Sequence, residues 1–257
     1  MEQFNILYSK NGVHFLTEPE LDFERHYLEA RKREGWLYSD DHLKTLPDTQ
    51  KNDPHVTIWK QRKQSLNRFL NYLAGMQQTP RNILEIGCGN GWFSQKLTEG
   101  IGAAKVFAID INLYELQQAA RVFGEQNPVW LYGDIVKTSL PRLFFDLIVF
   151  NAALHYFPDL PLLFNHIHPA LMQDGEIHIF DSPFYSAEKQ KDAKKRIESY
   201  YLKLGVKAMA AYYHAHSTET LVPYNLQLLY DPGTRPNRLK RMAGIDINPM
   251  PWIRLRP

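Results

Sequence analysis

The sequence predicts an α/β fold built on a doubly wound, mostly parallel sheet. Between residues 83 and 184, short apolar runs alternate with segments of helical spacing, and this alternation is typical of βαβ units with right-handed crossovers. The run FDLIVFN, residues 145–151, is apolar on both faces, as in a parallel strand that helices cover on each side. The 257 residues are 44% hydrophobic and 23% charged, which is enough for one large domain with additions.

Residues 1–52 precede this alternation and are predicted to form an N-terminal hairpin and a helical lid. Asn11-Gly12 lies between two apolar runs, which is a signal of a two-residue hairpin turn. Residues 20–35 have the spacing of a short amphipathic helix that ends at a glycine. Residues 36–52 are predicted to be a loop with aromatic side chains.

A second domain is predicted over residues 53–257, and it begins with a strong helix at Asp53-Pro54. Aspartate is a good N-cap, and proline fits the first helical position. Apolar residues spaced by three and four predict the buried face of this helix as Trp59, Leu66, Phe69, Leu70 and Leu73.

Five core strands follow, with helical patterns between them. The predicted strands are residues 82–87, 105–110, 129–134, 145–151 and 176–181. After residue 184 the pattern changes to a charged helix over 187–204 and a segment rich in aromatic residues and histidine. The last part holds two strand-like runs, NLQLLY and PWIRLRP, on either side of one short basic helix.

Composition excludes several classes of protein. Cys88 is the single cysteine, so no internal disulfide forms, and a reducing compartment is expected. No segment approaches the roughly 18 uninterrupted apolar residues of a membrane span, and the first residues lack the apolar stretch of a secretory signal. The formal net charge of +2 predicts no polyanionic partner. We therefore expect a cytoplasmic protein.

The first core strand ends in three glycines at alternate positions, Gly87, Gly89 and Gly91. Ligands of doubly wound sheets bind beyond the carboxyl ends of the strands, and glycine allows positive φ and a close approach to the backbone. A glycine-rich turn without a ligand is the alternative. Trp92 stands where the dinucleotide fingerprint has its third glycine, and the phosphate-binding loop motif is absent.

The acid before these glycines indicates the charge of the ligand. Glu85 would repel a pyrophosphate and suits a cation, so the cofactor that fits is S-adenosylmethionine, which has an ammonium group, a sulfonium and no phosphate. The sequence LEIGCGNG, residues 84–91, resembles the first motif of the class I S-adenosylmethionine-dependent methyltransferases, of the small-molecule, bacterial type-11-like kind. The resemblance continues at the later strand ends and covers residues 82–184.

This resemblance implies a Rossmann-like sheet of seven strands, the last two being an antiparallel C-terminal hairpin. It also implies a methyltransferase domain over 53–257, in which a helical insertion over 186–224 shapes the substrate pocket. The implied cofactor residues lie at the strand ends. Glu85, Gly87 and Gly89 serve the methionine amine and the backbone approach, Asp110 the ribose hydroxyls, Ile111 and Ile135 the adenine ring, Asp134 the adenine amine, and Asn151 the methionine and methyl. Alone, Asp110 and Asp134 would be interpreted equally well as helix caps.

The implied reaction is in-line transfer of a methyl group to an O or N atom of a small-molecule acceptor, which leaves S-adenosyl-L-homocysteine. The chain must hold the acceptor close to the methyl carbon in a site short of water. His155 and Tyr156 are the catalytic candidates, because they follow Asn151 at the mouth of the expected pocket. A merely structural histidine is the alternative for His155.

Further residues are expected around the acceptor. Asp181 either touches it or caps a turn. His214, His216, Tyr212 and Tyr213 either recognise the acceptor or pack within a helix. We expect no metal site, because the sequence has no H-E-x-x-H motif and no cysteine cluster.

The expected lid is aromatic. Trp36, Tyr38 and Trp59 are large rings upstream of the core, suited to closing over the adenosine or an apolar acceptor. Arg62 and Lys63 follow Trp59 by about one turn and are predicted to pair with the methionine carboxylate, the alternative being that they are exposed surface residues.

Two other functions remain open at this stage. A nucleic-acid methyltransferase is kept by the basic runs at 31–33 and 238–241, although residues 151–154 read NAAL rather than Asn-Pro-Pro-aromatic. The other is a non-catalytic protein that binds S-adenosylmethionine as a sensor or scaffold. A nicotinamide dehydrogenase is disfavoured by the glycine spacing.

Overall fold

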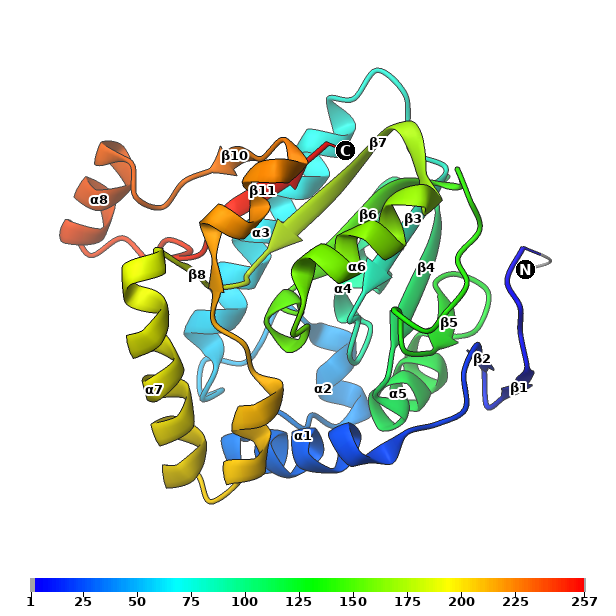
Figure 1. Cartoon of the computed structure of the whole chain (residues 1–257), viewed down its shortest axis with the longest axis horizontal. Coiled ribbons are helices and arrows are strands. Elements are labelled where there is room, and N and C mark those ends of the chain that lie inside the picture. Colours follow the sequence, from blue (N-terminus) through cyan, green and yellow to red (C-terminus); the bar gives the residue numbers. More distant parts are fainter. Residues whose placement is uncertain (1–2, 257) are drawn as a thin grey trace.

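The structure is a computed structural model that describes residues 3–256. Its centre is a nine-stranded sheet in the order β1-β2-β5-β4-β3-β6-β7-β11-β10 (Figure 1). The strands are β1 (Tyr8–Lys10), β2 (Val13–Phe15), β3 (Asn82–Ile86), β4 (Lys105–Asp110), β5 (Val129–Tyr132), β6 (Phe145–Asn151), β7 (Leu171–Phe180), β10 (Gln227–Tyr230) and β11 (Trp252–Leu255). Residues 1, 2 and 257, at the ends of the two predicted domains, lie outside the described part.

The direction of the central strands places the site. β3 pairs in parallel with β4 and β6, β4 with β5, and β6 with β7. Their carboxyl ends therefore meet at one edge of the sheet, where ligands of doubly wound folds bind. The C-terminal strands β10 and β11 are antiparallel, and β11 joins β7.

The strands from β5 to β10 form the expected seven-stranded sheet, and the N-terminal hairpin extends it by two strands. β2 runs parallel to β5, with Val13 opposite Trp130 and Phe15 opposite Tyr132. Val13 and Phe15 are fully buried, so burial of these side chains holds the hairpin at the sheet edge. The predicted boundary between residues 1–52 and 53–257 thus separates the hairpin from the sheet that it joins.

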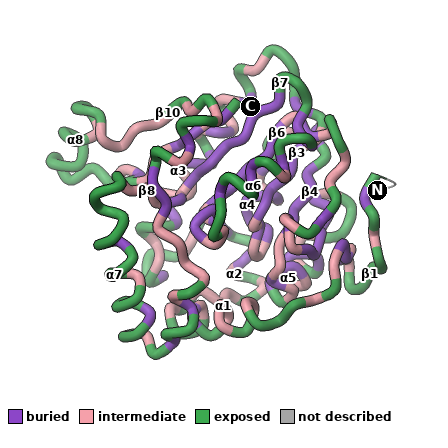
Figure 2. The backbone as a smooth tube through the Cα atoms, in the orientation of Figure 1, coloured by how far each residue is buried: buried purple, intermediate pink, exposed green. Residues whose placement is uncertain are grey.

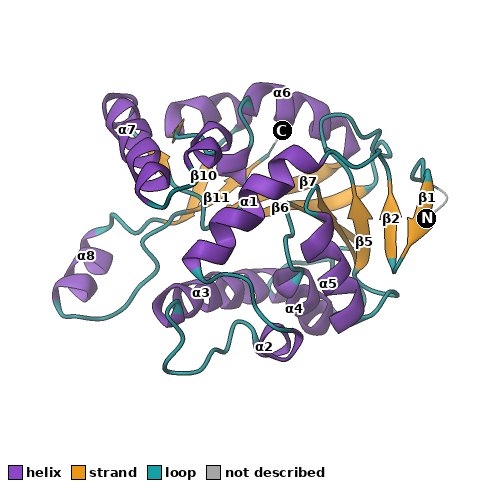
Figure 3. Ribbon diagram, turned by 90° about the horizontal axis from the view of Figure 1, so that it is seen from below, coloured by secondary structure: helices purple, strands orange, loops and turns teal. Residues whose placement is uncertain are grey.

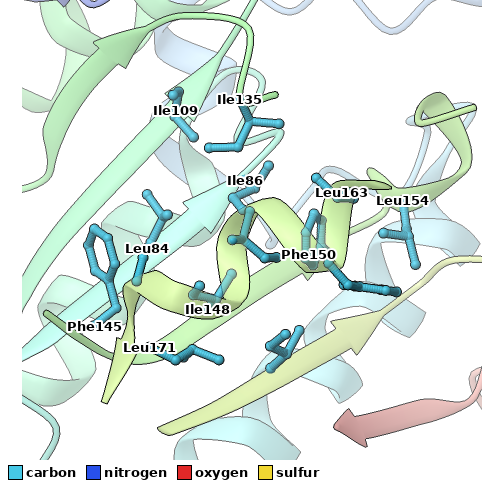
Figure 4. Close-up of a cluster of buried hydrophobic side chains, with 14 of the residues drawn as sticks. Leu84, Ile86, Ile109, Ile135, Phe145, Ile148, Phe150, Leu154, Leu163 and Leu171 are labelled. Atoms are coloured by element: carbon cyan, nitrogen blue, oxygen red, sulfur yellow. The ribbon is translucent and has the colours of Figure 1, made fainter. Parts of the chain in front are cut away.

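Helices cover both faces of the sheet. α3 (Val56–Ala74), α4 (Trp92–Ile101) and α5 (Leu113–Phe123) pack on one face, and α6 (Leu160–Ile167) packs on the other. Figure 4 shows the core on the α6 face, where Leu163 lies among side chains from the central strands. Buried residues are concentrated in the strands, as Figure 2 shows.

A third group of elements lies beyond the carboxyl ends of the strands. It comprises α1 (Leu21–Glu34), α2 (Asp40–Thr45), α7 (Ala187–Lys203) and the short helix η3 (Lys207–Tyr212). Figure 3 shows α1 crossing in front of the sheet from this side. The Tyr212 hydroxyl donates to Asp22 at 2.6 Å, and the Tyr200 hydroxyl donates to Glu34 at 2.7 Å, so α1 is attached to the 186–224 segment.

The remaining elements are short. They are η1 (Leu154–Tyr156), η2 (His168–Ala170), η4 (Thr218–Tyr224), the parallel pair β8 (Phe184–Tyr185) and β9 (His216–Ser217), and α8 (Arg235–Met242). The basic helix α8 has no buried residue and projects from the molecule (Figure 1). In the described part of the chain, no helix is both long and apolar enough to cross a membrane.

Two predicted boundaries are wrong. The 36–52 segment contains α2, whose N-cap Ser39 accepts a hydrogen bond from the His42 backbone. α3 begins at Val56 rather than at Asp53-Pro54, because the Asp53 carboxylate accepts from the His55 backbone at 2.6 Å and closes a turn before the helix. Of the predicted inner face of α3, only Leu70 is not fully buried.

Candidate functional site

A cavity of about 400 Å³ opens at the carboxyl ends of β3, β4 and β6, beneath α1 and α3. This is within the usual size range of small-molecule sites. Eleven of the predicted site residues lie in its wall, namely Trp59, Arg62, Glu85, Gly87, Gly89, Asp110, Ile111, Asp134, Ile135, Asn151 and Tyr156. The topology thus brings the strand ends and the N-terminal helices to one space.

The three glycines of the first turn all have positive φ, but only Gly87 and Gly89 line the cavity. A Cβ on Gly87 would lie 2.4 Å from the Ala153 Cβ, and one on Gly91 would lie 2.5 Å from the Trp130 ring. Gly91 does not line the cavity, so its missing side chain serves the packing of the turn on the sheet. The idea that all three glycines make room for a ligand is wrong for Gly91.

Asp110 joins the first two strand ends. Its carboxylate accepts hydrogen bonds from the backbone N–H of Gly89 at 2.7 Å and of Asn112 at 2.8 Å. Burial raises its pKa to about 6, and the backbone donors oppose that rise. Asn112, rather than Asp110, is the N-cap of α5. Since a carboxylate has about four acceptor positions, Asp110 retains acceptor capacity toward the cavity.

Two further buried carboxylates stand beside the glycine turn. Glu85 accepts a hydrogen bond from the Ser94 hydroxyl, and burial raises its pKa to about 8. Glu115 accepts from the Asn112 side chain at 3.1 Å, and its Oε2 lies 3.1 Å from where a Gly89 Cβ would be. Burial, followed by the charge of Asp110, raises the Glu115 pKa to about 7. Three acids so close together suit a cationic ligand.

Glu115 lines the cavity, and sequence reasoning missed it. It belongs to the first turn of α5, where an acid is expected because it complements the helix dipole. Nothing in the sequence distinguishes it from such a surface acid.

Asp134 and Ile135, which follow the third core strand and are predicted to contact the adenine, are also in the cavity wall. The Asp134 carboxylate accepts from the Val136 backbone at 3.2 Å, and Lys137 lies 3.4 Å from it. Ile135 is buried and lies near Ile109 in the core (Figure 4).

Cys88 is buried in the turn, and burial raises its thiol pKa well above the ordinary value, which leaves the thiol protonated.

The aromatic side of the cavity holds the guanidinium of Arg62. Arg62 lies over the rings of Trp36 and Trp59, at 5.0 and 4.8 Å from its central carbon. Among residues 3–256 the Arg62 side chain forms no hydrogen bond or ion pair; burial lowers its pKa, and the charge of Asp181 opposes this. Trp59 donates its indole N–H to the Tyr38 hydroxyl at 2.7 Å. Lys63 pairs with exposed Asp48 instead, so the predicted carboxylate contact of Lys63 is wrong.

The structure places His155 behind Tyr156. The His155 ring is buried between Tyr156 and Tyr213, with centroids 4.3 Å from each, and it does not line the cavity. Burial holds its pKa well below the ordinary value, so the ring is neutral. The prediction that His155 contacts the acceptor as a base is therefore wrong, because the η1 turn directs this side chain inward.

Helix α1 contributes a cluster that the sequence did not reveal. Phe23, Tyr27 and Arg31 line the cavity together with Tyr156 and Tyr212. The rings meet edge to face, at 72° for Phe23 with Tyr156 and 77° for Tyr27 with Tyr156. Arg31 lies 4.8 Å above the Tyr27 ring. These residues belong to an ordinary amphipathic pattern, and only the tertiary fold turns them toward the strand ends.

Other candidates lie outside the cavity wall. Asp181 accepts from the Ser65 hydroxyl at 2.9 Å and the Asn248 amide at 2.6 Å, so it holds α3 to the C-terminal segment. His214 and His216 do not line the cavity either. Within residues 3–256 no group of three or more histidine, cysteine, aspartate or glutamate side chains is arranged to hold a metal ion.

The basic run at 31–33 does not form a free basic surface. Arg31 is turned into the cavity and pairs with Glu34 at 2.5 Å, while Arg33 pairs with Glu29 at 2.7 Å. Most of the positive charge of this run is therefore matched by acids of the same helix.

A model of the methyltransferase domain family matches residues 58–221 of this chain. A malonyl-[acyl-carrier protein] O-methyltransferase of Ilyobacter polytropus is 33% identical over 96 residues, which are 37% of this chain and 36% of that protein. The chain thus matches about a third of the length of that curated relative.

Solved structures share the fold at low sequence identity. An S-adenosylmethionine dependent methyltransferase from Mesorhizobium loti is 22% identical, with a TM-score of 0.52 over 74% of this chain and 96% of that chain. The plantazolicin methyltransferase BpumL, in complex with a monoazolic desmethylPZN analogue and SAH, is 15% identical, with a TM-score of 0.51 over 91% of this chain and 98% of that chain.

Proposed function

Given that this chain belongs to the methyltransferase domain family, within the class I S-adenosylmethionine-dependent methyltransferases, we propose that it is an enzyme that transfers a methyl group from S-adenosylmethionine to an O or N atom of a small-molecule acceptor. One observation carries the proposal. A single cavity joins the strand ends that bear the cofactor motifs to an aromatic wall supplied by α1 and α3. Methyl donor and acceptor can therefore meet in one space.

The charges of the cavity wall fit the proposed cofactor group by group. Asp110 takes the ribose hydroxyls, and Asp134 with Ile135 takes the adenine. The carboxylates of Glu85 and Glu115 complement the positive ammonium and sulfonium groups. Arg62, whose side chain forms no ion pair in the described chain and interacts with Asp181 only through its charge, pairs with the methionine carboxylate.

When bound, S-adenosylmethionine supplies a methyl group on sulfur, already activated for displacement. The chain positions the acceptor in line with the carbon–sulfur bond and excludes water. Tyr156 lies in the wall and orients the acceptor by donating a hydrogen bond. Such a reaction needs no dedicated nucleophile on the protein.

The test is the ligand that the purified protein retains and turns over. We expect S-adenosylmethionine or S-adenosylhomocysteine by ultraviolet and mass analysis, and S-adenosylhomocysteine formation with a methyl acceptor. Retention of a nicotinamide dinucleotide would contradict the cofactor. Tight binding without turnover of any acceptor would instead support a non-catalytic binding protein.

A further inference from the structure

We propose that the acceptor is a carboxylic acid, held as its carboxylate by Arg31 and Tyr156 and methylated on oxygen. This inference rests on the proposed methyl transfer and names its substrate class. Three features of the part of the cavity beneath α1 carry it. They are the hydrogen-bond donors, the positive charge of Arg31, and the absence of histidine and lysine from the described lining residues.

Arg31 and Tyr156 form a pair of donors in the cavity wall. One Arg31 nitrogen donates to Glu34 at 2.5 Å, and the other donates to the Tyr156 hydroxyl oxygen. A guanidinium has five N–H donors, so Arg31 retains others. Because the Tyr156 oxygen accepts from Arg31, its own proton is free to be donated. An N–H beside an O–H matches the two oxygens of a carboxylate.

The same wall lacks the side chain that most often acts as a general base. Among the described residues that line the cavity there is no histidine or lysine. Burial raises the pKa of Tyr156 and, more strongly, that of Tyr27, so both phenols stay protonated and donate. Of the wall acids, Glu115 accepts a hydrogen bond from the Tyr27 hydroxyl and interacts with the charge of Arg31. The others lie at the glycine turn, at the adenine end, or at Asp159, which caps α6 by accepting from Leu162 at 2.9 Å. An acceptor that is already deprotonated at neutral pH suits this surface.

The charge of Arg31 distinguishes a carboxylate from an amine. A cage of aromatic rings can bind an ammonium group, but here the Arg31 guanidinium already lies over the Tyr27 ring. A second cation would compete with this guanidinium for the ring. A carboxylate instead meets the N–H donors of Arg31 that Glu34 leaves free. The rings of Phe23, Phe157 and Tyr212 then contact the apolar body of the acid.

The proposed step is balanced without a proton transfer. A carboxylate oxygen forms a bond to the methyl carbon as the carbon–sulfur bond breaks, and the electron pair of that bond goes to sulfur. One anion and one sulfonium become a neutral methyl ester and a neutral thioether. Loss of both charges is favoured in a cavity that excludes water.

The experiment compares matched acceptors. Phenylacetate, benzoate and hexanoate are incubated with the full chain and S-adenosylmethionine, beside the corresponding amides and amines. We expect methyl esters, identified by mass and by cleavage in mild base, at rates at least about tenfold above any product of the amides or amines. Faster methylation of an amine than of every carboxylate would overturn the inference.

Variants test the two donors. Tyr156→Phe leaves the Arg31–Glu34 pair in place and is expected to raise KM for the carboxylates about tenfold, with Arg31→Gln raising it further. Arg25→Gln, on the same helix but with an exposed side chain paired to Asp22, is the control and is expected to leave KM unchanged. Equal KM for all four proteins would contradict the assignment.

Cofactor binding separates this inference from the proposed function. If S-adenosylhomocysteine binds but the loaded protein neither binds nor methylates any of the three carboxylates, the carboxylate inference fails and methyl transfer stands. If S-adenosylhomocysteine itself does not bind to the folded wild-type protein, the proposed function fails as well.

Discussion

Asp110 is the residue on which cofactor recognition is expected to depend most. Its carboxylate is already oriented by the N–H groups of Gly89 and Asn112, so a ribose meets a fixed acceptor. We expect Asp110→Ala to weaken S-adenosylhomocysteine binding by about 1–3 kcal/mol through loss of a charge-assisted contact. Calorimetry measures this, with Asp174→Ala at an exposed site as control. Unchanged affinity would contradict the ribose assignment.

Glu115 allows a sharper test, because the methyl donor is cationic at sulfur and the product is neutral there. If the Glu115 carboxylate lies near the sulfonium, Glu115→Gln is expected to weaken S-adenosylmethionine binding about three- to tenfold more than S-adenosylhomocysteine binding. Titration of both ligands gives the ratio. Exposed Glu99→Gln serves as control, and equal losses for the two ligands would argue against this placement.

These residues also mark what sequence reasoning can reach. Asp110 is predictable because it ends a strand, and parallel strand ends converge at one edge of the sheet. Glu115 and Arg31 are not, since each belongs to a helix whose pattern is equally that of a solvated face. The prediction for His155 fails because its position four residues after Asn151 fixes its distance along the chain but not the direction of its side chain in η1.

The turn between β3 and α4 is the element whose packing is most sensitive to a single methyl group. Gly91→Ala introduces a Cβ at positive φ, 2.5 Å from the Trp130 ring. Backbone strain and overpacking together are expected to lower the free energy of unfolding by about 2–4 kcal/mol. Gly102→Ala is the matched control, because Gly102 also has positive φ but no atom within 4 Å of its Cβ position.

Urea unfolding of the two variants separates packing from strain. We expect Gly102→Ala to cost about 1 kcal/mol, the strain part alone. Equal losses in both variants would show that Trp130 moves aside and that the turn tolerates a side chain there.

At the level of elements, long periodic segments were predictable and short or edge elements were not. α3 has a clear apolar period, and the core strands are short continuous apolar runs. α2 has only six residues, too few to show one. The hairpin turn at Asn11-Gly12 is a local signal and was found, but the pairing of β2 with β5 depends on contacts more than a hundred residues apart in the chain.

In the whole molecule, burying the carboxyl groups of the cation site lowers the free energy of unfolding of the ligand-free protein. Glu85, Asp110 and Glu115 all have pKa values raised by burial, to about 8, 6 and 7. Their ionised forms are disfavoured in the ligand-free fold. A cationic ligand relieves this, and S-adenosylmethionine is therefore expected to stabilise the protein more at pH 8 than at pH 6.

These raised pKa values predict the sign of the pH dependence of the free energy of unfolding. An unfolded glutamate loses its proton near pH 4.5, whereas folded Glu85 keeps its proton to about pH 8. Between these values the folded state binds more protons, so the free energy of unfolding falls as pH rises. Buried histidines such as His155 act in the opposite direction, but only up to the ordinary histidine pKa of about 6.5.

Above pH 7 the histidine contribution is complete, and Glu85 dominates. The free energy of unfolding of the ligand-free protein is expected to fall by about 1 kcal/mol between pH 7 and pH 8, near the limit of about 1.4 kcal/mol per pH unit for one group. Glu85→Gln keeps a partner for the Ser94 hydroxyl but cannot ionise, so its curve is expected to fall less than half as far, with Glu115 supplying the remaining slope. Urea unfolding at several pH values measures both curves, with Glu99→Gln expected to follow the wild type. A wild-type curve that is flat or rises between pH 7 and pH 8 would mean that Glu85 is ionised in the free protein and that the cavity solvates it.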